Sequence, residues 1–231
     1  MKRQGMRLWE ERKLAGYHQD ELACKIGMFP AKLHRAETDE SYLAFRELYR
    51  VSELNLDANY IITGYKHPKA EKSPFHAYSE AQLYECMRVL VSSYLLGRTI
   101  EDAAVGKDFG FSNTYVRYIL NSYYKNDNVF SFLHRESGMT QAQLAAKLMI
   151  DDKTFRKLEK GKAEPDCELL MKLYEQYAIT PAFVLKERNA MIRELSFCME
   201  QFGDFGKRVV SYLLLVKSEE YNQTEETVVS L

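Results

Sequence analysis

Apolar residues along most of the chain recur three and four positions apart, the spacing that places them on one face of an α-helix. One such stripe follows Ser79-Glu80-Ala81-Gln82, a helix-capping pattern, and consists of Leu83, Met87, Leu90, Val91 and Tyr94. Near the carboxyl end a second stripe consists of Met191, Leu195, Cys198 and Phe202. Glycine and proline are scarce, with 11 and 5 residues, which disfavours a turn-rich β-sandwich. The pattern predicts an all-α protein.

The chain also repeats itself at an offset of 122 residues. The first copy, GYHQDELACKIGMFPAKLHRAE (16–37), matches GMTQAQLAAKLMIDDKTFRKLE (138–159). After this stretch we expect a small length difference to break the register, before NLDANYIITG and AITPAFVLKE agree again in pattern. Two copies of a unit of roughly 60 residues are predicted, at about 7–66 and 129–187.

Each copy has the pattern of two short helices joined by a tight bend. In the second, Thr140 is a candidate N-cap, and Leu144, Ala145 and Leu148 follow at helical spacing. Phe155 and Leu158 then point inward, and Gly161 ends the second helix. The first copy repeats this with Leu22, Ala23 and Ile26, then Gly27, whose left-handed conformation suits a tight turn. This is the geometry of a helix-turn-helix.

Both copies resemble the Cro/CI-repressor (XRE) helix-turn-helix family. The matching residues of the first copy are Arg12, Gly16, Gln19, Leu22, Ala23, Gly27, Leu33 and Glu37; those of the second are Gly138, Gln141, Leu144, Ala145, Phe155, Glu159, Gly161 and Pro165. The resemblance implies two tandem five-helix domains that bind operator DNA. The copies depart from the family pattern at Met149, at Asp151-Asp152 and at Glu37-Thr38-Asp39-Glu40-Ser41, which lacks the usual glycine and proline.

A third, shorter match to the wider bacterial helix-turn-helix pattern runs from Thr99 to Leu120. It rests on Val105, Phe109, Gly110, Ser112, Val116 and Leu120, with Ser112 as the expected cap of the recognition helix. An ordinary helical hairpin would show much the same spacing. The polar stretch Lys66 to Pro74 (KHPKAEKSP) that precedes this region has the composition of a linker.

We therefore expect helix-turn-helix domains at 1–66 and 129–187. A linker and helical segment occupies 67–128, and C-terminal helices occupy 188–231. Val209 to Val216 is apolar on most sides, which makes this last region the candidate for homodimerisation.

The resemblance places the DNA contacts at defined positions. Gln19 and Gln141 would bind phosphate from the start of the second helix of each unit. The recognition helices would read bases with Ala31, Lys32, His34 and Arg35 in the first copy; with Ser112, Asn113, Thr114 and Arg117 in the middle segment; and with Lys153, Thr154 and Lys157 in the second copy. A solvated charged face is the simpler reading of the basic residues around Lys157.

Charge does not select a partner, because 32 basic and 33 acidic side chains give a net charge of −1. The four cysteines form no CxxC pair, so we expect no zinc or redox site and no cofactor, with thiols buried in a reducing cytoplasm. No catalytic motif and no run of ~20 apolar residues is present, so we expect neither an enzyme nor a membrane protein.

The sequence thus predicts a cytoplasmic, homodimeric regulator of transcription that binds double-stranded DNA through major-groove helices. The alternative is a protein-interaction module, such as an antitoxin or an assembly factor, built on helix-turn-helix scaffolds. Asp39, Glu40, Asp151 and Asp152 and the balanced charge favour this alternative.

Overall fold

The computed structural model describes residues 3–99, 111–121, 128–204 and 208–209. Within these ranges every regular element is a helix and no strand occurs, which confirms the all-α prediction. No helix in the same part of the chain is long and apolar enough to cross a membrane.

Two sets of five helices form the largest parts of the molecule. The first unit comprises α1 (Gln4–Leu14), α2 (Gln19–Ile26), α3 (Pro30–Glu37), α4 (Phe45–Glu53) and α5 (Ala58–Thr63). The second unit comprises α8 (Val129–Ser137), α9 (Gln141–Lys147), α10 (Asp152–Glu159), α11 (Cys167–Tyr177) and α12 (Pro181–Leu185). The residues predicted to face inward are fully buried in both, including Leu22, Ala23, Ile26 and Leu33 in the first unit and Leu144, Ala145, Leu148 and Phe155 in the second.

The offset of 122 extends further through the structure than the sequence indicates. Left-handed backbone conformations recur at this offset in four pairs: Gly16 and Gly138, Gly27 and Met149, Asp39 and Gly161, and Gly64 and Lys186. The starts of α4 and α11 keep the same offset. The predicted change of register after Glu37 and Glu159 is confirmed, but it does not fall in the loops that follow them directly, which are equally long. The register changes only later, since α11 is two residues longer than α4 and α12 is one residue shorter than α5.

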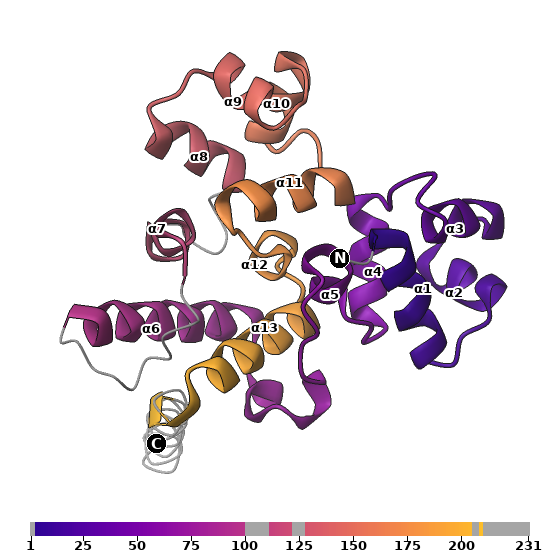
Figure 1. Cartoon of the computed structure of the whole chain (residues 1–231), viewed down its shortest axis with the longest axis horizontal. Helices are drawn as coiled ribbons and strands as arrows, with labels where there is room; N and C mark the ends of the chain where they lie inside the picture. Colours follow the sequence, from indigo (N-terminus) through magenta and orange to yellow (C-terminus); the bar gives the residue numbers. More distant parts are fainter. Residues whose placement is uncertain (1–2, 100–110, 122–127, 205–207, 210–231) are drawn as a thin grey trace, which may run out of the picture.

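The remaining helices pack between and below the units (Figure 1). They are two short 3₁₀ helices, η1 (Ala70–Lys72) and η2 (Pro74–Ala77), followed by α6 (Glu80–Thr99), α7 (Asn113–Asn121) and α13 (Arg188–Gln201). The capping prediction for α6 is confirmed, since the Ser79 N–H donates to Gln82 Oε1 at 2.9 Å. Both predicted stripes, on α6 and on α13, are buried. The segment expected as a linker is packed into the body, because Ala70 is about 1% exposed and the His67 side chain is 2% exposed.

The two units contact each other directly, and α13 joins them. Helix α5 packs against α11 and α12, while α13 runs beside α4, α5, α6 and α12. The Asn59 side chain donates to the Ala190 carbonyl at 2.9 Å, and the Cys167 N–H donates to the Leu43 carbonyl at 3.1 Å. This arrangement leaves α2–α3 and α9–α10 at separate outer ends of the molecule (Figure 1).

The four cysteines are free, but only Cys86, Cys167 and Cys198 are buried; Cys24 is exposed because it lies on the outer face of α2. The clustered tyrosines serve packing, as expected, where the structure describes them, since Tyr94, Tyr115 and Tyr118 are at most 2% exposed.

Residues 210–231, which hold most of the candidate dimerisation segment, lie outside the described residues, as do 100–110 of the third match.

Candidate nucleic-acid interface

The bend between the second and third helices of each unit positions the candidate recognition helix. At this bend Gly27 has φ +71° and Met149 has φ +55°, so a non-glycine residue occupies the left-handed conformation in the second unit. After α3 and α10, Asp39 (φ +62°) and Gly161 (φ +65°) show the same exchange in reverse. Asp39 is also tied to the start of α1, because its Oδ1 accepts a hydrogen bond from the Gly5 N–H at 2.7 Å. The departures from the family pattern thus leave the backbone path unchanged.

In the first unit, a buried ion pair holds the glutamine expected to bind phosphate. The Arg12 guanidinium donates from Nε to Glu37 Oε1 at 2.6 Å and from Nη2 to Glu37 Oε2 at 2.9 Å. Gln19 Nε2 donates to Glu37 Oε2 at 2.9 Å. A side-chain amide has two N–H bonds, so the second one is left for a partner outside the unit.

A similar arrangement in the second unit uses a histidine in place of the arginine. His134 Nδ1 lies 2.5 Å from Glu159 Oε1, and Gln141 Nε2 donates to Glu159 Oε2 at 2.6 Å. His134 and Glu159 are 37% and 15% exposed, whereas Arg12 and Glu37 are 5% and 4% exposed. Both glutamines are therefore oriented by a glutamate from the recognition helix, but the second arrangement is more open to solvent.

The helix starts that would face phosphate carry different charges in the two units. The first turn of α2 contains Asp20 and Glu21, and the Glu21 carboxylate accepts from the His18 N–H at 2.8 Å. In α9 the capping box is neutral, since the Thr140 N–H donates to the amide oxygen Oε1 of Gln143 at 2.9 Å. Because a helix N-terminus attracts anions and nearby carboxylates repel them, α9 suits a phosphate better than α2 does.

The recognition helix of the first unit begins with apolar residues. Phe29 is 83% exposed directly before α3, and Pro30 and Ala31 are also exposed. Lys32 is turned toward α4, where its Nζ lies 2.5 Å from Glu47 Oε1. The remaining predicted contacts on this helix, His34 and Arg35, have exposed side chains.

The recognition helix of the second unit begins with acidic residues, and basic residues follow them. Asp151 caps α10, because its carboxylate accepts from the Thr154 N–H at 2.9 Å and from the Thr154 hydroxyl at 2.6 Å. These hydrogen bonds lower the pKa of Asp151. Asp152 lies 4.0 Å from the Arg156 guanidinium. Lys153 and Lys157 are exposed, and neither forms an ion pair within the described part of the chain.

The candidate contacts of the middle segment lie on α7. Ser112 caps this helix as predicted, since its Oγ accepts from the Tyr115 N–H at 3.1 Å; the same hydroxyl donates to the Tyr177 carbonyl at 2.6 Å. Asn113 and Arg117 are exposed, and Thr114 is half-buried. The turn and preceding helix of this third match fall in 100–110, outside the described residues, so only its last helix can be placed.

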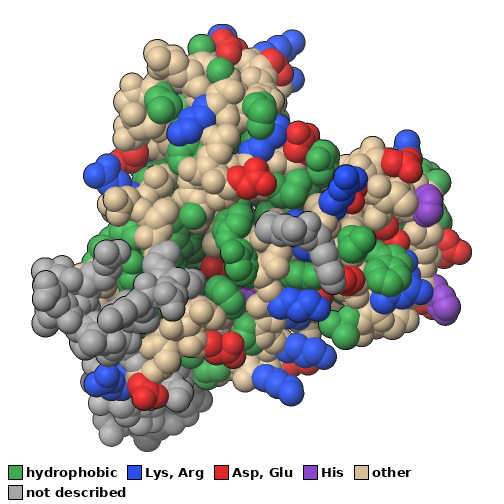
Figure 2. Space-filling view, in the orientation of Figure 1, with side chains coloured by type: hydrophobic (Ala, Val, Ile, Leu, Met, Phe, Trp, Pro, Cys, Tyr) green, Lys and Arg blue, Asp and Glu red, His purple; other side chains and the backbone are tan. Residues whose placement is uncertain are grey.

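The exposed lysine and arginine side chains of the three candidate recognition helices do not form one surface. Arg35, Arg117 and Lys157 are all exposed, but they belong to α3, α7 and α10, in separate parts of the molecule (Figure 1). On the face shown in Figure 2, basic and acidic side chains are interspersed over the second unit. A strongly basic clamp is absent from this face, in keeping with the balanced composition.

Fold and site geometry together define an all-helical protein with a helix-turn-helix in its second unit. Comparison with known families supports this: the family model described as Helix-turn-helix matches residues 135–184, from the end of α8 to α12. Helix-turn-helix domains of this XRE type bind DNA, so the match indicates a DNA-binding kind of function. Searches of curated proteins and of solved structures give no significant match.

Two features of this interface were not predicted from the sequence. The acids at Asp20 and Glu21 escaped notice, although the repeat aligns them with Ala142 and Gln143 and so contained the signal. The hydrogen bonds from Gln19 to Glu37 and from Gln141 to Glu159 were also not predicted. Both pairs are 18 residues apart, and only the crossing of the two helices brings them together.

Proposed function

We propose that the protein is a cytoplasmic, sequence-specific DNA-binding regulator of transcription whose second unit makes the main contact with the duplex. One observation carries the proposal: α9 begins without an acidic residue and presents an oriented Gln141, beside a recognition helix with two exposed lysines. The family match to the same residues supports it.

In this proposal α9 lies against the phosphate backbone and α10 enters the major groove. The N-terminus of α9 and the second N–H of Gln141 bind phosphate. Lys153 and Lys157 contact phosphate or guanine from the exposed face of α10, with Thr154 beside them. Asp152 is placed to accept a hydrogen bond from the amino group of a cytosine, which would contribute specificity rather than affinity.

The first unit is proposed as a second XRE-type copy that binds DNA more weakly. Its fold matches the second unit helix by helix, and Gln19, Ala31, Lys32, His34 and Arg35 occupy the corresponding positions. Asp20 and Glu21 weaken its phosphate contact, and Glu47 competes for Lys32. Asn113, Thr114 and Arg117 on α7 remain proposed auxiliary contacts capped by Ser112, and homodimerisation through the C-terminal segment remains a proposal.

A protein-binding role of the first unit is the second candidate. Phe29 is 83% exposed at the tip of its recognition helix, beside acids that disfavour DNA. An exposed aromatic side chain of this kind is typical of protein interfaces. An antitoxin or an assembly factor would use this surface, and no reaction is proposed for either candidate.

The test is fluorescence anisotropy of the full chain with duplexes selected from a random pool, at several salt concentrations. Binding through phosphate contacts makes the logarithm of the affinity fall linearly with the logarithm of the salt concentration. We expect one sequence to be preferred over the random pool by at least about 1,000-fold. Absence of any salt-dependent preference, together with a stoichiometric protein partner that DNA does not displace, would replace this proposal with the protein-binding one.

A further inference from the structure

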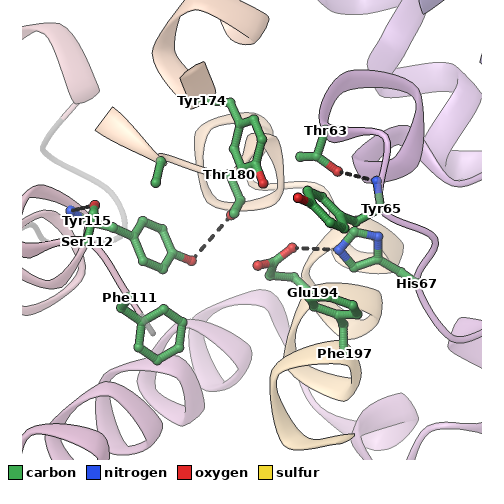
Figure 3. Close-up of a pocket in the computed structure, with 11 residues that line it drawn as sticks. Thr63, Tyr65, His67, Phe111, Ser112, Tyr115, Tyr174, Thr180, Glu194 and Phe197 are labelled. Atoms are coloured by element: carbon green, nitrogen blue, oxygen red, sulfur yellow. Dashed lines mark hydrogen bonds and ion pairs between the residues drawn. The ribbon is translucent and has the colours of Figure 1, made fainter. Parts of the chain in front are cut away.

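A cavity of about 90 Å³ lies where four separate parts of the chain meet. Its wall includes the segment after α5, the start of α7, the end of α11 with the following loop, and the middle of α13 (Figure 3). The first of these segments leaves the first unit, and the third belongs to the second unit. Any molecule bound here would contact both units at once.

A buried carboxylate and a histidine carry the charges in the wall of this cavity. Glu194 is 3% exposed, and its Oε2 lies 3.1 Å from His67 Nε2. On the other side of the ring, His67 Nδ1 lies 3.5 Å from Asp57 Oδ2. Burial alone would lower the pKa of His67, but Asp57 and Glu194 together raise it to about 9, so the ring is protonated at neutral pH. Two carboxylates share this one positive charge.

The charge of Glu194 also reaches the other polar groups near the cavity. Burial, with a contribution from Glu194, raises the pKa of Tyr174 to about 12 and raises the pKa values of Tyr115 and Cys198. Arg193, the next residue on α13, does not cancel this charge within the cavity, because its guanidinium donates to the carbonyls of Asn55 and Pro68 outside it. In the wall itself Glu194 faces the protonated His67, and Asp57 behind the ring adds a second carboxylate, so these three groups together carry a net charge of −1.

Hydroxyl groups and aromatic rings complete the wall. The hydroxyls of Tyr65 and Tyr174 and the carboxylate of Glu194 turn toward a common centre, with the rings of Phe111 and Phe197 below them (Figure 3). The two tyrosine hydroxyls have no hydrogen-bond partner in the described part of the chain. The Tyr115 hydroxyl, by contrast, is already bonded to Thr180 Oγ1 at 3.3 Å.

We propose that this cavity binds a small organic cation, an alkylammonium group, and that the bound ligand links the two units. The ammonium donates hydrogen bonds to Glu194 and to the free hydroxyls of Tyr65 and Tyr174, while the aromatic rings enclose its alkyl part. An anion would be repelled by Glu194, and a neutral alkyl group would leave the hydroxyls of Tyr65 and Tyr174 without a partner. A cavity of about 150 Å³ holds the six carbons of benzene, so this volume suits about four non-hydrogen atoms. A fifth atom would extend toward solvent beside Tyr65, which is 56% exposed.

Binding is tested on the full chain without DNA, by isothermal titration calorimetry and thermal unfolding. The probe is n-butylammonium chloride, compared with n-butanol and sodium butyrate at equal ionic strength. We expect saturable binding of butylammonium and a rise of the unfolding midpoint by about 5–10 °C at one hundred times its Kd. An equal response to butanol, a response to butyrate, or no response to butylammonium up to about 10 mM would overturn the proposal.

Two cavity variants and one control locate the site. Tyr174→Phe removes one free hydroxyl without breaking a hydrogen bond inside the protein, and we expect about five- to tenfold weaker binding of butylammonium. Glu194→Gln removes the charge and should weaken binding at least about 50-fold; if this variant does not fold, Tyr174→Phe still decides. Lys157→Ala, on the proposed DNA surface, should bind butylammonium unchanged, so this test and the DNA-binding test fail independently. Unchanged binding by Tyr174→Phe would overturn the proposed site.

Discussion

The two units share one skeleton and differ at the surfaces where a duplex would lie. At the start of the second helix the first unit has Asp20 and Glu21, where the second has Ala142 and Gln143. At the start of the recognition helix the second unit has Asp151 and Asp152, where the first has Phe29 and Pro30. Each unit thus carries a pair of acids at one of the two positions. A helix-turn-helix backbone is thus kept in both units while the residues at its candidate binding surface differ.

The contact of the recognition-helix glutamate behind each interface, Arg12–Glu37 in the first unit and His134–Glu159 in the second, shows a second difference. We call this contact the clamp. Arg12 makes two hydrogen bonds to Glu37 and a third, at 3.0 Å, to the Tyr17 carbonyl. His134, its counterpart, reaches Glu159 through a single nitrogen. The first unit is therefore held by a desolvated ion pair, and the second by a solvated contact.

The largest expected effect concerns this clamp. Glu37→Ala leaves the Arg12 guanidinium buried and without its charged partner, so we expect a loss of about 3–5 kcal/mol in the free energy of unfolding. The matched change, Glu159→Ala, removes the partner of a partly exposed His134 and should cost about 1 kcal/mol or less. Urea denaturation followed by circular dichroism measures both. Equal losses would show that the two clamps are energetically equivalent despite their different burial.

The next effect concerns DNA affinity. Reversing two exposed charges on α10 with Lys153→Glu and Lys157→Glu should weaken binding of the selected duplex at least about 100-fold, because each contact contributes about 1–3 kcal/mol. Arg35→Glu alters the residue of α3 that the offset of 122 pairs with Lys157. If the second unit makes the main contact, this variant should lose less than about fivefold in the same anisotropy assay.

Lys153, Lys157 and Arg35 are all exposed on their helices, so unchanged helix content by circular dichroism is the control for folding. A larger loss in Arg35→Glu than in the α10 variant would assign the main contact to the first unit.

Much of the architecture followed from sequence because each unit is locally consistent. The apolar spacing of Leu144, Ala145 and Leu148 and the cap at Thr140 are properties of neighbouring residues, and the structure shows the helix that they predict. Because the sequence repeats, the same helices could be predicted in the other unit as well. The expected change of register is present, but its position inside α11 was not predicted, because sequence alone does not distinguish a residue added in a helix from one added in a loop.

The contacts that join the parts could not be predicted in this way. Glu194 and His67 are 127 residues apart, and neither belongs to a recognisable motif. Their pairing depends on how α13 packs beside α5 and η1, which is a tertiary choice that local patterns do not determine. The family resemblance was enough to choose the candidate DNA contacts. It did not predict their partners within the protein, such as Glu47 for Lys32.

A smaller effect is expected from exchanging the acids at the helix starts. Asp20→Ala with Glu21→Gln gives α2 the residues of α9 and keeps a side chain able to accept from the His18 N–H. We expect about three- to tenfold tighter binding of duplex DNA and a steeper dependence on salt, because phosphate is no longer repelled. The reciprocal change, Ala142→Asp with Gln143→Glu, should weaken binding by about tenfold or less. A salt dependence that neither pair of changes alters would place phosphate elsewhere.

The smallest effect is expected for Met149 at the bend itself, where the units differ by one residue type. Met149 holds φ +55° and is 66% exposed, so its side chain gains little from burial to offset a conformation that costs a non-glycine residue about 1 kcal/mol. Met149→Gly should therefore stabilise the protein by about 0.5–1 kcal/mol in urea denaturation. Gly27→Ala makes the opposite exchange, and its Cβ would meet Arg50 Nη1, which now donates to the Ile26 carbonyl at 2.9 Å. We expect this variant to lose about 1–2 kcal/mol, since strain is added and that hydrogen bond is displaced. If Met149→Gly instead destabilises the second unit, the methionine side chain contributes contacts that outweigh its backbone strain, and the two bends are not equivalent.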